Sequence, residues 1–82
     1  GPAQDSPALI EEVICRAKTP PDIMLLAQAY TVLGEEWEFQ GNIALALTCY
    51  RDVLAVLEGS DLPGLGIWAR RALNRHGEFH PL

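Results

Sequence analysis

Two histidines near the end of the chain have the spacing of a helical metal pair. His76 and His80 are four residues apart, so a continuous helix would place both imidazoles on one face, where Zn²⁺ could bind them. However, Gly77 and Pro81 interrupt a helix here, and Glu78 alone does not complete a four-ligand site. We therefore expect no metal at these residues and no cofactor elsewhere in the chain.

The other reactive side chains also lack the partners that catalysis needs. Cys15 and Cys49 could form at most one disulfide, but both lie in apolar helical patterns, where a free cysteine behaves as a small hydrophobe. Glu35, Glu36 and Glu38 are close in sequence, but on a helix Glu36 points away from the other two. No nucleophile lies beside a base, and there is no glycine-rich phosphate loop. We expect a protein without enzymatic activity.

Composition narrows the class of protein further. The chain has 82 residues, 49% of them hydrophobic, which is enough to build one small domain with a packed core. Its net charge of −5 argues against nucleic-acid binding. No apolar run approaches the roughly 18–20 residues of a membrane span. Two unpaired cysteines favour a reducing, intracellular compartment, and we expect a cytoplasmic protein.

The ends of the chain differ in composition from its centre. Gly1 and Pro2 resemble the scar that a tag-cleaving protease leaves, which suggests a fragment of a longer protein. We expect residues 1–5 to be a scar and a disordered lead. Residues 6–77 then form one helical domain, and residues 78–82 a frayed tail.

Apolar residues recur with helical periodicity throughout the central region, and no period-two pattern competes. The sequence predicts an all-α fold of antiparallel hairpins with about four helices. Their expected spans are 6–18, about 20–39, 42–58 and 63–76.

Capping residues and glycines set these boundaries. Ser6 can cap the first helix, with Pro7 at its first position, and Thr19 can cap the second, with Pro20 in its first turn. Gly41 permits the left-handed turn between the second and third helices, and Asn42 suits the start of the third. Gly59 and Gly77 are the expected stops of the last two helices.

One segment, "YTVLGEEWEFQGNIALALTCYRDVL", keeps aromatic and small residues at fixed offsets. The residues are Tyr30, Leu33, Gly34, Trp37, Gly41, Ala46, Tyr50 and Val53. Their order resembles the tetratricopeptide (TPR) repeat: aromatic, Leu-Gly, aromatic, Gly turn, Ala, aromatic, small apolar residue. The match covers about residues 27–61, and "LNRHGEF" is a weaker second match. The resemblance implies a right-handed stack of hairpins whose helices cross closely at the small residues, with the aromatics filling the gaps around them.

A polar stripe follows the second helix at spacings of three and four residues: Gln28, Thr31, Glu35 and Glu38. The TPR resemblance places this stripe in a concave groove that binds a peptide or helix of a partner protein, with Arg71 and Asn74 beside it. Glu35 and Glu38 would favour basic groups. The alternative is an ordinary solvated face. In TPR domains that clamp acidic C-terminal tails this surface carries Lys, Arg and Asn, so we do not expect chaperone-tail binding.

The helix start "GNIALALTCYRDVL" is also similar to the second helix of microtubule-interacting-and-transport (MIT) domains. That resemblance implies a three-helix bundle that reads helical tails of membrane-remodelling proteins. Both families use antiparallel hairpins, so the local sequence leaves the two open.

The last helix is basic in an otherwise acidic chain. Arg70, Arg71 and Arg75 could form a second interaction face that docks on an acidic partner or on a second copy, which would give a homo-oligomer. The alternative is a solubilising surface. We expect Trp68, with Ala69 and Leu73, to pack in the core against the preceding hairpin.

Overall fold

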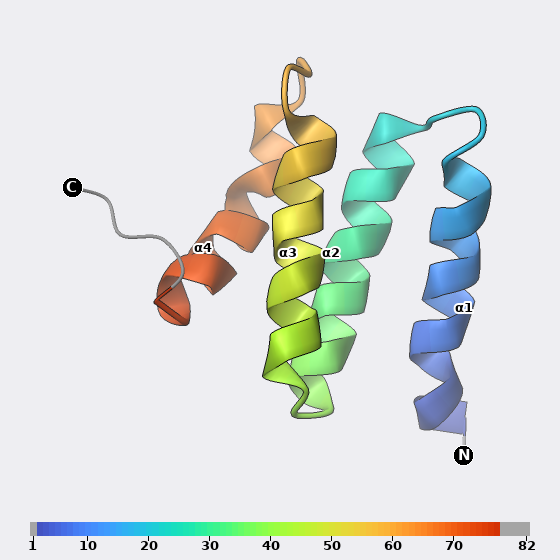
Figure 1. Cartoon of the computed structure of the whole chain (residues 1–82), viewed down its shortest axis with the longest axis vertical. Coiled ribbons are helices and arrows are strands. Elements are labelled where there is room, and N and C mark those ends of the chain that lie inside the picture. The colour runs from blue at the N-terminus through green and yellow to red at the C-terminus, as the bar shows by residue number, and fades with distance from the viewer. Residues whose placement is uncertain (1, 78–82) are drawn as a thin grey trace.

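Four α-helices follow one another in the part of the chain that can be described, residues 2–77 of a computed structural model, with side chains from residue 6. They are α1 (Pro2–Ala17), α2 (Ile23–Phe39), α3 (Ile43–Leu57) and α4 (Ile67–Arg75), with a 3₁₀ turn, η1 (Pro63–Gly66), before α4 (Figure 1). The predicted all-α fold with antiparallel hairpins is confirmed. No described helix is long and apolar enough to cross a membrane. The expected tail, 78–82, lies outside the described residues.

The start of α1 differs from the prediction. The helix begins at Pro2, so Ser6 is not its N-cap and Pro7 lies inside the helix. Residues 2–5, expected as a disordered lead, form its first turn. Pro7 is the sixth residue of α1, and because proline has no backbone N–H it removes one intrahelical hydrogen bond at this point.

The start of α2 also corrects the prediction. Its N-cap is Asp22, whose Oδ1 accepts a hydrogen bond from the backbone N–H of Leu25 at 3.1 Å. Thr19 is not the cap. Pro20 is followed by Pro21, and a residue before proline is pushed out of the helical conformation, so the helix cannot begin at Pro20.

The turn between α2 and α3 matches the prediction. Gly41 has a positive φ of 85°, a left-handed conformation that glycine adopts without strain. Asn42 caps α3 by accepting the N–H of Leu45 at 3.3 Å. Gly59 and Gly77 end α3 and α4 in the same left-handed conformation, as expected.

α2 and α3 form the α2–α3 hairpin, and they cross at Gly34, where the lack of a side chain leaves a notch in the surface of α2. Gly34 is buried, and a Cβ at this position would lie 2.6 Å from Cε1 of Tyr50, whose side chain fills the notch from α3. Tyr50 is only 2% exposed, and Ala46 and Val53 beside it are fully buried. Small residues with an aromatic between them therefore set the close crossing, as the spacing of these residues predicts.

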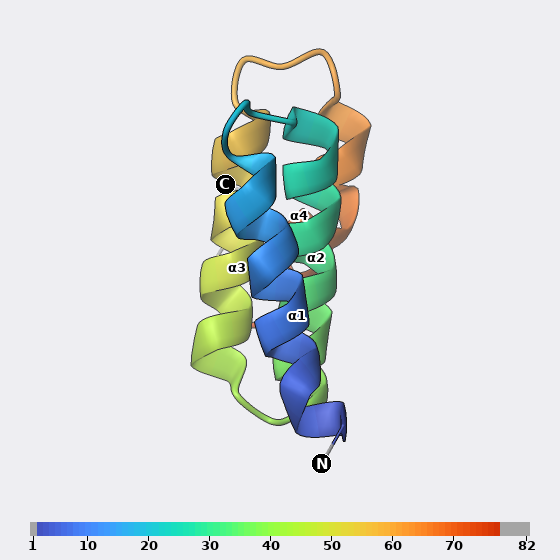
Figure 2. The same ribbon diagram turned by 90° about the vertical axis from the view of Figure 1, so that its right-hand side faces the viewer.

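α1 and α4 lie on opposite sides of the α2–α3 hairpin (Figures 1 and 2). α1 buries Ile14 and Ala17 against Leu26, Ala29 and Leu33 of α2. α4 packs on the other side through a face of small side chains, with Ala69, Ala72 and Leu73 buried. Each helix packs chiefly against its neighbour in sequence. Two apolar clusters therefore meet along the hairpin.

Trp68 corrects the prediction for α4. Ala69 and Leu73 are fully buried as expected, but Trp68 is 65% exposed. It precedes Ala69 by one residue, which is about 100° around the helix, and the narrow buried face of α4 does not reach it. The first four residues of the expected last helix also form the 3₁₀ turn η1 rather than α-helix.

Candidate functional site

The polar stripe of α2 does not form one uniform surface. Gln28 is exposed and borders a pocket between α1 and α2. The hydroxyl of Thr31 donates to the carbonyl of Ala27 in its own helix, at 2.8 Å. Glu35 is exposed, whereas the side chain of Glu38 is only 23% exposed. The stripe therefore has members in different environments, and they are not equally available to a ligand.

Glu38 ties three helices together. It accepts a short hydrogen bond from the hydroxyl of Tyr50 on α3. From the end of α4 it receives Arg75 Nη2 at 3.1 Å and contacts His76 Nε2 at 3.3 Å. Burial alone would raise the pKa of Glu38, but hydrogen bonds from Tyr50, His76 and Arg75 outweigh burial and the pKa is lowered. The carboxylate of Glu38 is therefore already bound by side chains of α3 and of the end of α4.

The bond to Glu38 also affects Tyr50. Burial and then the neighbouring carboxylate raise the pKa of the Tyr50 phenol far above its ordinary value, so the hydroxyl keeps its proton and remains a donor. The pair thus fixes one end of the hairpin and anchors α4 to it.

The three arginines of α4 do not share one face. Arg75 is bound to Glu38, and the guanidinium of Arg71 stacks on the ring of Trp68, 5.2 Å from its centroid. Arg70 instead faces the end of α3. Asn74 is exposed. The predicted basic face is therefore divided among a salt bridge, a cation–π contact and a pocket.

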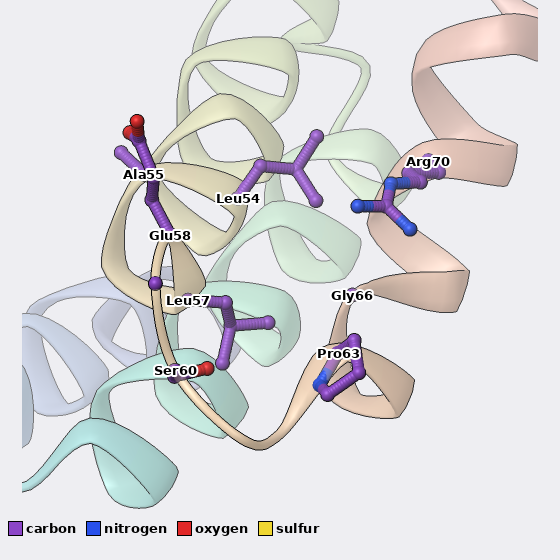
Figure 3. Close-up of a pocket in the computed structure, with 9 residues that line it drawn as sticks. Leu54, Ala55, Leu57, Glu58, Ser60, Pro63, Gly66 and Arg70 are labelled. Carbon is purple, nitrogen blue, oxygen red and sulfur yellow. The ribbon is translucent and has the colours of Figure 1, made fainter.

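Arg70 borders a pocket of about 410 Å³ between the end of α3, η1 and α4 (Figure 3). Its guanidinium extends toward Leu54. Pro63 and Gly66 lie on the same side of the pocket as Arg70, and the carboxylate of Glu58 is turned away. A lone guanidinium could bind an anion, but the residues that line the pocket include no second cation. It is a weaker candidate site than the groove described next.

Sequence reasoning missed a groove between α1 and α2, which we call the α1–α2 groove. It is lined by Ile10, Val13, Leu25, Gln28, Ala29 and Val32, encloses about 240 Å³ and has almost no polar lining. Val13 is 42% exposed, Leu25 39% and Val32 49%, although all three are aliphatic. The sequence held a signal for it. α2 carries more apolar residues than one buried face needs, and Leu25, Ala29 and Val32 form a separate stripe at i, i+4 and i+7.

The α1–α2 groove continues toward the loop that joins its two helices. A second pocket shares Val13 and Leu25 with it and adds Arg16, Pro20, Pro21 and Asp22. Arg16 is held by Glu12, with Nη2 2.8 Å from Oε1. At this end, charged side chains therefore border the apolar floor of the groove.

The cysteines occupy different environments. Cys49 of α3 is buried, as expected, in the apolar cluster that α1 forms with α2 and α3. Burial raises its pKa to about 11, and the charges of Asp52 and Glu11 add to the effect. Cys15 was expected to be buried but is exposed, and it borders an open pocket between α1, α2 and α3. Both thiols are free.

Among the described residues, no three His, Cys, Asp or Glu side chains are grouped so that they could hold a metal ion. His80, the second member of the histidine pair, lies outside these residues.

Comparison with known proteins adds no relative: no protein-family description, curated protein or solved structure matches this chain.

Proposed function

We propose that this chain is a non-enzymatic protein-interaction module that binds a segment of another protein through a groove lined by α2. The observation that carries the proposal is the α1–α2 groove, in which Val13, Leu25 and Val32 leave much of their aliphatic surface in water. Burying apolar surface is favourable by roughly 25 cal/mol per Å², so a partner that covers these side chains gains free energy.

The TPR-like hypothesis fits the way the helices pack. Each helix contacts chiefly its neighbour in sequence, which is the arrangement of a stack of hairpins. An MIT-type bundle would close α2, α3 and α4 around one core. Ala27, Val53 and Leu73 belong to one apolar cluster that joins these three helices, so this alternative stays open. The proposed groove shares only Gln28 with the surface that the TPR resemblance implies, because that surface lies on the side of α2 toward α4. The two free thiols fit a reducing, intracellular location.

A displayed library of random peptides tests this function. We expect selection on the wild-type chain to enrich apolar peptides, and selection on Val32→Glu to lose them, because a carboxylate would enter the groove. Ala44→Glu is the matched control, since Ala44 is exposed on α3 and lines none of the groove. Enrichment that survives Val32→Glu, or that Ala44→Glu removes equally, would contradict the proposal. Circular dichroism should show that all three proteins are folded.

Self-association is a second candidate, favoured by two adjacent exposed side chains on α4. Ile67 is 47% exposed and Trp68 65%. If a second copy covers them, the mass measured by light scattering will rise with concentration, and Trp68→Ala will return it to that of a monomer. A constant monomer mass would remove this candidate.

A further inference from the structure

We propose that the α1–α2 groove accepts an amphipathic helix of two to three turns whose apolar stripe is flanked by basic side chains. This inference rests on the proposed function, because it names the occupant of the same groove. Four features of the groove support it: its lining, its length, its floor and the charges on its margin.

The lining favours a helix over an extended peptide. The walls are aliphatic, and Gln28 is the only polar side chain among the lining residues. An extended segment would bring backbone N–H and C=O groups that such walls cannot satisfy, at a cost in free energy. A helix satisfies these groups internally and presents only side chains. None of the elements in residues 2–77 is a sheet whose edge could pair with a strand.

The length of the groove matches two turns of helix. Leu25, Ala29 and Val32 span seven residues of α2, or about 10 Å at 1.5 Å per residue. Val13 faces them from α1, which runs antiparallel, and Leu9 extends the apolar face of α1 by one turn with 63% of its surface exposed. A partner helix with apolar residues at i, i+3, i+4 and i+7 covers the same distance.

The floor of the groove is deepest at Ala29, where a partner side chain can enter. Ala29 is 7% exposed and lies between Leu25 and Val32, which protrude on either side of it. A small residue between two larger ones leaves room for one large apolar anchor. Such anchors in water-excluding pockets supply most of the binding energy at interfaces.

Carboxylates dominate the margin of the groove. Asp22 and Arg16 border its loop end, and Arg16 is already paired with Glu12. At the other end Glu36 continues the stripe four residues beyond Val32.

The other basic side chain of this region, that of Lys18, does not neutralise the charge of these carboxylates. Lys18 borders a pocket on the opposite side of α1, together with Glu11 and Asp52. The margin of the α1–α2 groove is therefore net negative and complements lysines or arginines on the flanks of a bound helix.

Three labelled peptides that differ only in their flanks test this inference. Each carries the same leucine stripe at i, i+3, i+4 and i+7, flanked by Lys, Gln or Glu, and a fourth scrambles the Lys peptide. Fluorescence anisotropy with the whole chain measures their affinities at low and high salt. We expect the Lys-flanked peptide to bind about tenfold more tightly than the Glu-flanked one at low salt, and the difference to shrink at high salt because ions screen exposed charges.

Two variants assign the result to the groove and to its margin. Val32→Glu should lose the Lys-flanked and Gln-flanked peptides alike. Glu36→Gln should keep binding but narrow the preference for Lys. Val32 is exposed and Glu36 is half-buried, so the folded state should survive both changes.

The outcomes separate this inference from the function on which it rests. Equal affinity for Lys and Glu flanks overturns the assignment of charge, and equal affinity for the scrambled peptide overturns the helical occupant. In both cases the library selection can still support a protein-binding groove. Unchanged binding by Val32→Glu removes the groove itself. A dimer mass that Val32→Glu converts to a monomer would instead identify a second copy as the occupant, and would overturn the inference.

Discussion

Replacing Gly34 by alanine sets two physical effects against each other, the overpacking of the core and the higher helix propensity of alanine. The sign of the change in the free energy of unfolding shows which effect is larger. In Gly34→Ala the new Cβ would lie 2.6 Å from Cε1, 2.9 Å from Cζ and 3.0 Å from Cδ1 of the Tyr50 ring. Carbon atoms in contact are normally about 3.5–4.0 Å apart, so the ring or the helix must move by about 1 Å. The ring has little room to retreat, because it is 2% exposed and its hydroxyl is bound to Glu38.

The magnitude follows from two opposing terms. Overpacking a core costs about 1–3 kcal/mol, and the double constraint on Tyr50 places this case near the upper end. Replacing glycine by alanine inside a helix returns about 1 kcal/mol. We therefore expect Gly34→Ala to lower the free energy of unfolding by about 2 kcal/mol. For a domain of this size that corresponds to a melting temperature roughly 8–16 °C lower.

Urea denaturation followed by circular dichroism measures the change, and two controls accompany it. Glu35→Ala, next along α2 and exposed, should alter stability by less than about 0.5 kcal/mol. In a Tyr50→Leu background, which removes the ring, Gly34→Ala should become neutral or stabilising. A Gly34→Ala protein as stable as the wild type, or more stable, would refute the close crossing of α2 and α3 at this point.

Three further predictions concern charge, thiol reactivity and exposure. The lowered pKa of Glu38 means that this group contributes stability above the ordinary glutamate pKa of 4.5 and loses it as pH falls through the lowered value. The difference in unfolding free energy between wild type and Glu38→Gln should therefore shrink when urea titrations are repeated at acidic pH, and a constant difference would contradict this role. Iodoacetamide followed by mass spectrometry should label exposed Cys15 in the native protein and buried Cys49, with its pKa of about 11, only after unfolding; equal labelling would contradict the burial of Cys49. Trp68→Ala should cost at most about 0.5 kcal/mol and Trp37→Ala, which packs against both apolar clusters, about 3 kcal/mol, and similar losses in thermal denaturation would place Trp68 back in the core.

The elements that the sequence predicts well depend on local chemistry. Gly41 and Asn42 mark the turn and the cap of α3 because few other residues accept a left-handed backbone or a capping geometry. The pairing of Gly34 with Tyr50 was also readable, because a small residue and an aromatic at helical spacing imply a close crossing. The Asp22 cap could have been found too, since Pro21 excludes a helix start at Pro20.

The features that the sequence did not predict depend on how helices turn relative to one another. Glu38 looked like one more member of an exposed stripe, and nothing in α2 alone indicates that Tyr50 and Arg75 converge on it from two other helices. Trp68 is apolar, but the narrow face of α4 buries Ala69 instead. The α1–α2 groove likewise depends on the angle at which α1 lies on α2, which neither helix encodes by itself.

For the same reason, charge reversal at Glu38 would not test ligand binding to the α2 stripe alone. Glu38→Lys would place a cation against Arg75 and His76 and leave the Tyr50 hydroxyl without its acceptor, so it would perturb the fold as well as any ligand. Glu35→Lys, at an exposed position, remains a clean probe of binding.

The position of α1 at one side of the hairpin couples local opening to affinity. α1 contributes one wall of the proposed groove but is held mainly by one helix, so we expect it to detach while the α2–α3 hairpin and α4 stay folded. Only the closed fraction of molecules then presents a complete groove, and the apparent dissociation constant is the intrinsic one divided by that fraction. Ile14 and Leu33, which line none of the groove, would nevertheless tune affinity through this equilibrium, and amide hydrogen exchange in α1 would report its position.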